Sequence, residues 1–344
     1  MKTTLHNLLC CALMMCAMQS ANSQDLHFSQ FNEAPLLRNP ALAGIFTGDF
    51  RLQAVYRTQW QSVTVPYQTT SFNGEYRLPI GKGSDFVTVG GQILYDKAGS
   101  IAMTATNILP AVNYHKSLSD DKNMYISMGF MGGLVQRRFD RSKVTTNNQF
   151  DGNSYNSSIS DGENITTPSY SYFDGTVGLS FNSQIGENQD DNFFAGIAYH
   201  HFNRPSSISF YGNTKLEMIP KWVYSAGARM NTSENAYVTF QADYTAQGPH
   251  TEFIGGAIYT YKLDDTVDPI YLLHAGAFIR LKDAIIPVAK LEMRPLAISV
   301  SYDVNTSALS TTTRGRGGFE MAISYQKFLS KDNSSKNSLR CPRF

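Results

Sequence analysis

The sequence is poor in cysteine and in long apolar runs. It has four cysteines, and only Cys341 lies beyond residue 23. This excludes an intramolecular disulfide and a cysteine-based metal site in the rest of the chain. The same part of the chain has no apolar run near the roughly 20 residues that a membrane-spanning helix needs. A helical membrane protein is therefore excluded.

The first 23 residues have the features of a secretory signal. Lys2 is their only charged residue, an apolar run occupies 8–18, and small residues precede residue 24. We therefore predict that the chain is exported and that the mature protein begins at residue 24. Cys16 offers a lipoprotein alternative, but a methionine stands before it where a lipoprotein signal needs a small residue.

Charge does not favour a nucleic-acid partner. Removing Lys2 from the 29 basic residues leaves 28, against 28 acidic residues, so the mature chain is formally neutral before its histidines are counted. Nucleic-acid binding normally requires an excess of basic residues, so we expect no nucleic-acid partner. No Pro-rich or Gly/Ser-rich linker divides the chain before the polar tail that follows Leu329. One continuous architecture is expected.

Alternation of apolar and polar residues with a period of two dominates this architecture. It is clearest at 50–56, 238–244, 297–304 and 319–326, and Val55 is the one residue that breaks it. Such alternation puts an apolar face and a polar face on opposite sides of a strand. A soluble β-sandwich also alternates, but the signal sequence and strands of membrane-crossing length favour a membrane barrel.

Fourteen segments have this strand character. They are 48–57, 69–77, 86–96, 103–116, 124–137, 170–181, 193–202, 221–230, 237–246, 252–261, 271–280, 284–293, 296–304 and 317–327. An even number returns both termini to one side, which is the periplasm in bacterial barrels, where turns are short. The longest connections, 138–169 and 203–220, fall on the opposite, outer side. The sequence predicts an all-β fold, a transmembrane outer-membrane β-barrel of about 14 antiparallel strands.

The chain is accordingly divided into four parts. We predict a signal peptide at 1–23, an N-terminal periplasmic or plug segment at 24–47, the barrel at 48–328 and a periplasmic tail at 329–344. The apolar outer face of such a barrel requires outer-membrane lipid around it.

No enzymatic activity and no cofactor are expected. The sequence has no Gly-x-Ser-x-Gly elbow, no His-Glu-x-x-His motif and no phosphate-binding glycine-rich loop. Inward-facing carboxylates such as Asp243, Asp303 and Glu320 offer acid or base groups, but a polar lining is what a barrel lumen requires.

Metal binding is not expected either. Asp25 and His27 have no third ligand near them. His200 and His201 are adjacent on a predicted strand, so they should face opposite sides and cannot bind one ion together. The outer loop holds calcium-type oxygen ligands without EF-hand spacing, at Asp151, Asn153, Asp161 and Glu163.

Several short strings resemble the PorP/SprF family of type IX secretion systems. They are Asp25-Leu26-His27-Phe28-Ser29-Gln30-Phe31, Asn39-Pro40-Ala41-Leu42-Ala43-Gly44, Tyr56-Arg57-x-Gln59-Trp60, Asp96-Lys97-Ala98-Gly99, Tyr114-His115-Lys116, Tyr172-Phe173-Asp174 and Cys341-Pro342-Arg343-Phe344. No single string is specific, but together they extend over essentially the whole mature chain. Leu26 departs from the proline that the family pattern would have after Asp25.

The resemblance implies an outer-membrane barrel of gliding Bacteroidota. Its implied partners are the periplasmic ring and motor and peptidoglycan-tethering components of the secretion machine, or the C-terminal domain of one secreted adhesin. The implied partner-binding residues are Asp25, His27, Phe28, Ser29, Gln30, Phe31, Asn39, Pro40, Arg57, Trp60, Cys341 and Phe344.

Two alternatives stay open at this point. Phe28, Phe31 and Leu36 could seal the periplasmic end of the barrel instead of binding a partner. The whole barrel could also be a channel that passes a small solute, with the N-terminal segment as its gate.

Overall fold

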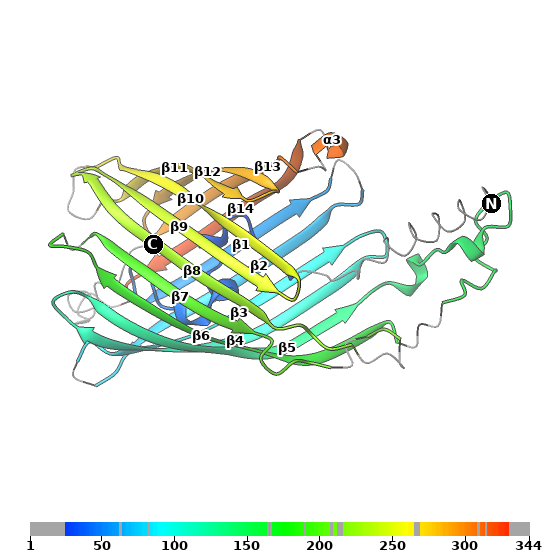
Figure 1. Ribbon diagram of the computed structural model, residues 1–344, viewed down its shortest axis with the longest axis horizontal. Helices are drawn as coiled ribbons and strands as arrows, with labels where there is room; N and C mark the ends of the chain where they lie inside the picture. The colour runs from blue at the N-terminus through cyan, green and yellow to red at the C-terminus, as the bar shows by residue number, and fades with distance from the viewer. Residues whose placement is uncertain are drawn as a thin grey trace, which may run out of the picture.

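The computed structural model describes residues 25–329 except 62–63, 82, 164, 166, 189, 207–208, 212–215, 265–268, 308–309 and 314. Within these residues, fourteen antiparallel strands close into one barrel (Figure 1). Each strand pairs with its neighbours along the chain, and β1 pairs with β14 to close the wall. The predicted fold class and number of strands are confirmed.

The strands are β1 (Phe50–Gln59), β2 (Tyr67–Pro79), β3 (Phe86–Ala98), β4 (Met103–Ser119), β5 (Met124–Arg138), β6 (Ser169–Gln184), β7 (Asn192–His200), β8 (Lys221–Ser233), β9 (Ala236–Gln247), β10 (His250–Lys262), β11 (Tyr271–Arg280), β12 (Ala284–Met293), β13 (Leu296–Asn305) and β14 (Arg316–Lys327). The helical turns are η1 (Phe31–Glu33), α2 (Pro35–Arg38), η2 (Pro40–Leu42), η3 (Arg141–Lys143), η4 (Asn147–Gln149) and α3 (Ser310–Thr313). No helix among the described residues is long and apolar enough to cross a membrane.

The two ends of the barrel differ in the length of their connections. One end, which we call the long-loop end, carries 60–66, 139–168, 201–220 and 306–315 and lies on the right in Figure 1. The other, which we call the short-turn end, carries tight connections such as 120–123, and β1 begins and β14 ends there. This division agrees with the predicted outer and periplasmic sides.

Burial in this barrel is the reverse of that in a soluble protein. In β9, Phe240 and Tyr244 face outward and are exposed, whereas Thr239, Gln241 and Asp243 face the lumen and are buried. An exposed apolar belt is stable only in contact with lipid, and closure leaves no strand edge with unpaired backbone groups in hydrocarbon. The predicted inward position of the carboxylates is therefore confirmed.

Two predicted strands extend two residues beyond the observed ones, and several others fall up to three residues short. β1 begins at Phe50 because Gly48, with a φ of 137°, lies before it in a conformation outside the strand region. β7 ends at His200 because His201 has a left-handed φ of 56°. His200 lies on the inner face of β7, and the turn brings His201 into the buried interior as well, so the expectation that they face opposite sides was wrong.

Candidate functional site

Residues 25–49 lie inside the barrel and run along it from one end to the other (Figure 1, dark blue). At the long-loop end, the backbone N–H of Asp25 donates to Gln247 Oε1 over 3.1 Å. At the short-turn end, the N–H of Asp49 donates to the carbonyl oxygen of Lys327 over 3.0 Å. Most side chains between these points are buried. We call residues 25–49 the lumen segment.

Apolar side chains of the lumen segment pack on apolar side chains that interrupt the polar inner wall. Phe28 packs with Val55, Leu94 and Ala322. This contact explains why Val55 is apolar in an otherwise polar series: the position faces a ring instead of water.

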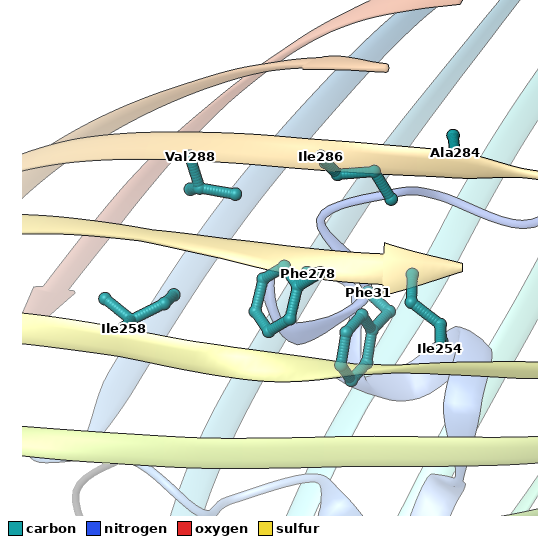
Figure 2. Close-up of a cluster of buried hydrophobic side chains, with 7 residues drawn as sticks. All are labelled: Phe31, Ile254, Ile258, Phe278, Ala284, Ile286 and Val288. Atoms are coloured by element: carbon teal, nitrogen blue, oxygen red, sulfur yellow. The ribbon is translucent and has the colours of Figure 1, made fainter. Parts of the chain in front are cut away.

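Phe31 makes the second apolar contact. Its ring meets that of Phe278 edge-on at 4.8 Å and lies in a cluster with Ile254 and Ile286 (Figure 2). These partners lie near the long-loop ends of β10, β11 and β12. One alternative expected Phe28 and Phe31 to seal the short-turn end. Their rings lie elsewhere in the lumen and do not do so.

A buried carboxylate receives the backbone of the lumen segment. Glu320 on β14 is fully buried and accepts the N–H groups of Ser29 and Gln30 at 2.6 and 2.7 Å. The guanidinium of Arg57 on β1 lies 3.1 Å from the same carboxylate and donates to the carbonyl oxygen of His27 over 2.8 Å. A short polar stretch is thus clamped by charge-assisted hydrogen bonds from two neighbouring strands.

The same cluster continues across the lumen. Asp303 accepts from Arg57 and from Arg280, each at 3.0 Å, and Arg280 also bonds the hydroxyl of Ser29. Two guanidinium groups and two carboxylates, counting Glu320, are therefore paired where little water reaches them. We call Arg57, Arg280, Asp303 and Glu320 the charge cluster.

At the long-loop end the lumen segment is held by a second group of charges. Asp25 Oδ2 lies 2.7 Å from His201 Nε2 and 2.8 Å from Lys221 Nζ. His201 Nδ1 lies 2.9 Å from Asp174 on β6. Burial alone would keep His201 neutral, but the carboxylates of Asp25 and Asp174 outweigh it and raise its pKa from 6.5 to about 9.

This histidine makes the anchor of the lumen segment dependent on pH. A raised pKa means that the protonated form stabilises the fold fully below pH 6.5, and that this contribution is lost as the pH rises through about 9. We expect the melting temperature of the wild type to fall between pH 6.5 and 9.5 more steeply than that of His201→Gln. Equal slopes in thermal unfolding scans would contradict the assignment.

The middle of the lumen segment is held by one ion pair and one polar turn. Arg38 pairs bidentately with Asp243 on β9 at 2.5 and 2.6 Å. In the turn η2, Asn39 Oδ1 caps the N–H of Ala41 at 2.8 Å, and its Nδ2 donates to backbone carbonyls of β6 and β7. Asn113 on β4 donates to the carbonyl oxygen of Ala41 over 2.9 Å.

Glycines let this turn approach the wall. A Cβ on Gly129 would lie 2.4 Å from the backbone N of Ala41 and the backbone C of Pro40. We expect Gly129→Ala to lower the free energy of unfolding by about 1–3 kcal/mol, because neither backbone can yield. Gly74→Ala is the matched control, since its Cβ meets only a terminal methyl of Leu52 at 3.3 Å. Similar melting temperatures for the two variants would refute this role of Gly129.

Near the short-turn end the backbone of the lumen segment is bound by buried charges. Glu75 accepts the N–H of Gly44 at 2.7 Å and pairs with Arg51 at 2.6 Å. Arg77 donates to the carbonyl oxygens of Phe46 and Gly48 at 2.8 and 3.1 Å. The chain is therefore fixed to the wall up to the start of β1.

The predicted partner-binding residues fall into three groups. A partner reaches Arg57 and the buried residues of the lumen segment only if that segment leaves the lumen, whereas Asp25 and His27 are partly exposed. The first group consists of the residues in the lumen segment. These are Asp25, His27, Phe28, Ser29, Gln30, Phe31, Asn39 and Pro40. Trp60 follows β1 at the long-loop end and is partly exposed. Cys341 and Phe344 lie outside the described residues.

Among the described residues no group of three or more metal-ligating side chains lies together. Two of the acidic residues of the outer loop bond within the loop instead, and Glu163 accepts from the hydroxyl of Tyr211 in 201–220. Asp151 accepts the N–H groups of Asn153 and Ser154, and Asp161 pairs with Arg141.

The sequence singled out Arg57, Asp243 and Glu320 but not three other wall residues that hold the segment. Arg280, Lys221 and Glu75 have the character of ordinary polar lumen positions. A usable signal was present at Ile286 and Val288, where apolar residues occupy the inner face that is polar elsewhere.

A closed barrel with an apolar exterior, a buried polar interior and a lumen occupied by its own N-terminal segment defines an outer-membrane-type β-barrel. The model of the type IX secretion system membrane protein PorP/SprF family matches residues 20–325. The chain belongs to this family, and it is located in the outer membrane.

No curated protein matches the chain. Among solved structures it is similar to the toluene transporter TbuX of Ralstonia pickettii, at 10% identity and a TM-score of 0.49, over 87% of this chain and 94% of that chain. It is also similar to the translocator domain of the autotransporter NalP from Neisseria meningitidis, at 10% identity and a TM-score of 0.45, over 87% and 96% of the two chains.

Proposed function

We propose that this type IX secretion barrel is a scaffold for other proteins. In this role it is fixed in the outer membrane by its apolar belt, and it presents its ends to partners. These partners are periplasmic components of the secretion machine or a secreted adhesin, whose export or surface attachment depends on the barrel.

One observation supports the scaffold over a solute channel. The lumen segment extends from end to end of the barrel and is bound to the wall by buried charge pairs and backbone hydrogen bonds. Displacing it for every transported molecule would separate Asp243 from Arg38 and Lys221 from Asp25, and would remove the N–H groups of Ser29 and Gln30 from Glu320. Leaving buried charges unpaired costs several kcal/mol.

The experiment is deletion of the gene, followed by two measurements on the same cells. We expect particular proteins to disappear from the cell surface and the culture medium while uptake of small solutes is unchanged. Reduced solute uptake with a normal set of surface and secreted proteins would overturn the scaffold and support the channel. Re-expression from a plasmid is the control.

The same experiment separates two forms of the proposal. A core component of the machine would be needed for all secreted products, whereas a barrel dedicated to one adhesin would be needed for one or a few. Co-purification with ring components or with an adhesin is the matching biochemical test.

A further inference from the structure

The lumen is not filled evenly. Towards the short-turn end the lumen segment lies against the first half of the barrel, where η2 contacts β4, β5, β6 and β7. The opposite half leaves a cavity of about 400 Å³ lined mainly by inner-face residues of β8 to β14. Asn32 and Thr47 of the lumen segment form its inner side.

The cavity reaches the short-turn end and is closed towards the long-loop end. Its lining includes Arg294 and Pro295 of the turn between β12 and β13, and Phe328 just after β14. At its inner limit is Ile258, which belongs to the cluster around Phe31. Figure 2 shows Ile258 and Val288 at one end of that cluster and Ile254 and Ala284 at the other. A group that enters from the short-turn end therefore meets packed side chains.

The walls of the cavity are polar and carry an excess of positive charge. Three cationic residues line it, Arg229, Lys290 and Arg294, and the exposed Lys327 lies at its rim, against one carboxylate, Glu292. Glu33 lies just behind the wall, 2.6 Å from Lys290 Nζ, so cations still exceed carboxylates by four to two. Neutral donors and acceptors such as Thr239 and Gln241 complete the lining.

The geometry of these cations suits a ligand with more than one acidic group. The Arg229 guanidinium is held 3.6 Å from the centre of the Tyr237 ring, and Arg294 Nε lies 2.7 Å from Glu292. Planar, oriented guanidinium groups bind carboxylates with two hydrogen bonds each. A volume of this size accommodates several side chains of a peptide, more than a single small anion fills.

We propose that this cavity binds an acidic peptide segment of a protein partner that approaches from the short-turn end. The chain's own tail is a poor occupant, because 330–344 contains four basic residues and one acidic side chain. The inference rests on the proposed scaffold function and gives the chemistry of its partner. Its test is separate, because it measures peptide binding to the purified protein and not secretion by cells.

The test uses the full-length protein in detergent micelles and fluorescence anisotropy of a labelled peptide in which glutamate alternates with glycine. We expect it to bind at least about tenfold more tightly than the same peptide with glutamine, and less tightly as salt rises. The double variant Arg294→Glu/Lys327→Glu should lose at least about tenfold in affinity. Lys116→Glu is the control, because Lys116 pairs with Asp85 at the same end and does not line the cavity.

Results of three kinds would overturn the proposal. One is equal binding of the glutamate and glutamine peptides, or binding that the double variant does not change. Another is displacement of the peptide by free glutamate as effectively as by unlabelled peptide, which would make the cavity a small-anion site. The third is binding that occurs only after removal of 330–344, which would make the tail the occupant.

Discussion

Arg57→Ala is expected to lower the free energy of unfolding by about 3–5 kcal/mol, because it leaves buried charges without their partner. Arg57 is 1% exposed and faces Asp303 and Glu320, at 3.0 and 3.1 Å. Removing it leaves two buried carboxylates with the single guanidinium of Arg280. The carbonyl oxygen of His27 also loses its donor. Urea unfolding in micelles, followed by tryptophan fluorescence, measures the change.

A double-mutant cycle shows whether the loss comes from uncompensated charge. Arg57→Ala combined with Glu320→Gln should cost less than the sum of the two single variants, because the excess negative charge is removed with the cation. Arg316→Ala is the matched control. Arg316 is exposed at the start of β14, and its loss should change stability by less than about 0.5 kcal/mol. Additive costs in the cycle would show that Arg57 and Glu320 act independently.

Deletion of 24–44 is expected to open the lumen while the barrel stays folded. The strands bond to each other around a closed wall, so their backbone pairing does not depend on the lumen segment. The wall residues that the segment covers are mostly polar and would be hydrated once it is gone. Heat-dependent mobility on gels should show a folded barrel, and planar-bilayer recordings should show ion currents that the wild type lacks.

The same deletion should abolish recovery of protein partners. Asn32 forms part of the inner side of the cavity and Phe31 packs against its closed end, and both are removed. Gly129→Ala is a useful comparison, because it disturbs the turn η2 while leaving the segment in place. Pull-downs from the deletion strain that look like those of the wild type would contradict a role of the segment in partner binding.

The sequence by itself determined the wall of this protein. Alternation of apolar and polar residues depends only on the two-residue period of a strand, which is local, so fourteen strands and the two faces of segments such as 238–244 could be predicted. The inward carboxylates of Asp243, Asp303 and Glu320 followed from the same period. Even Val55 was recognisable as an exception before its partner was known.

Only the tertiary structure decided what occupies the lumen inside this wall. Ser29 and Glu320 are 291 positions apart in the chain, and no local pattern indicates that one bonds the other. The turn at His201, which carries its ring inward to Asp25, depends on a left-handed backbone conformation that histidine seldom adopts. The lumen segment is polar with scattered aromatics, and such a composition suits a periplasmic extension as well as a buried plug. Its path was settled by long-range pairing of charges inside a closed barrel, where an unpaired charge is costly.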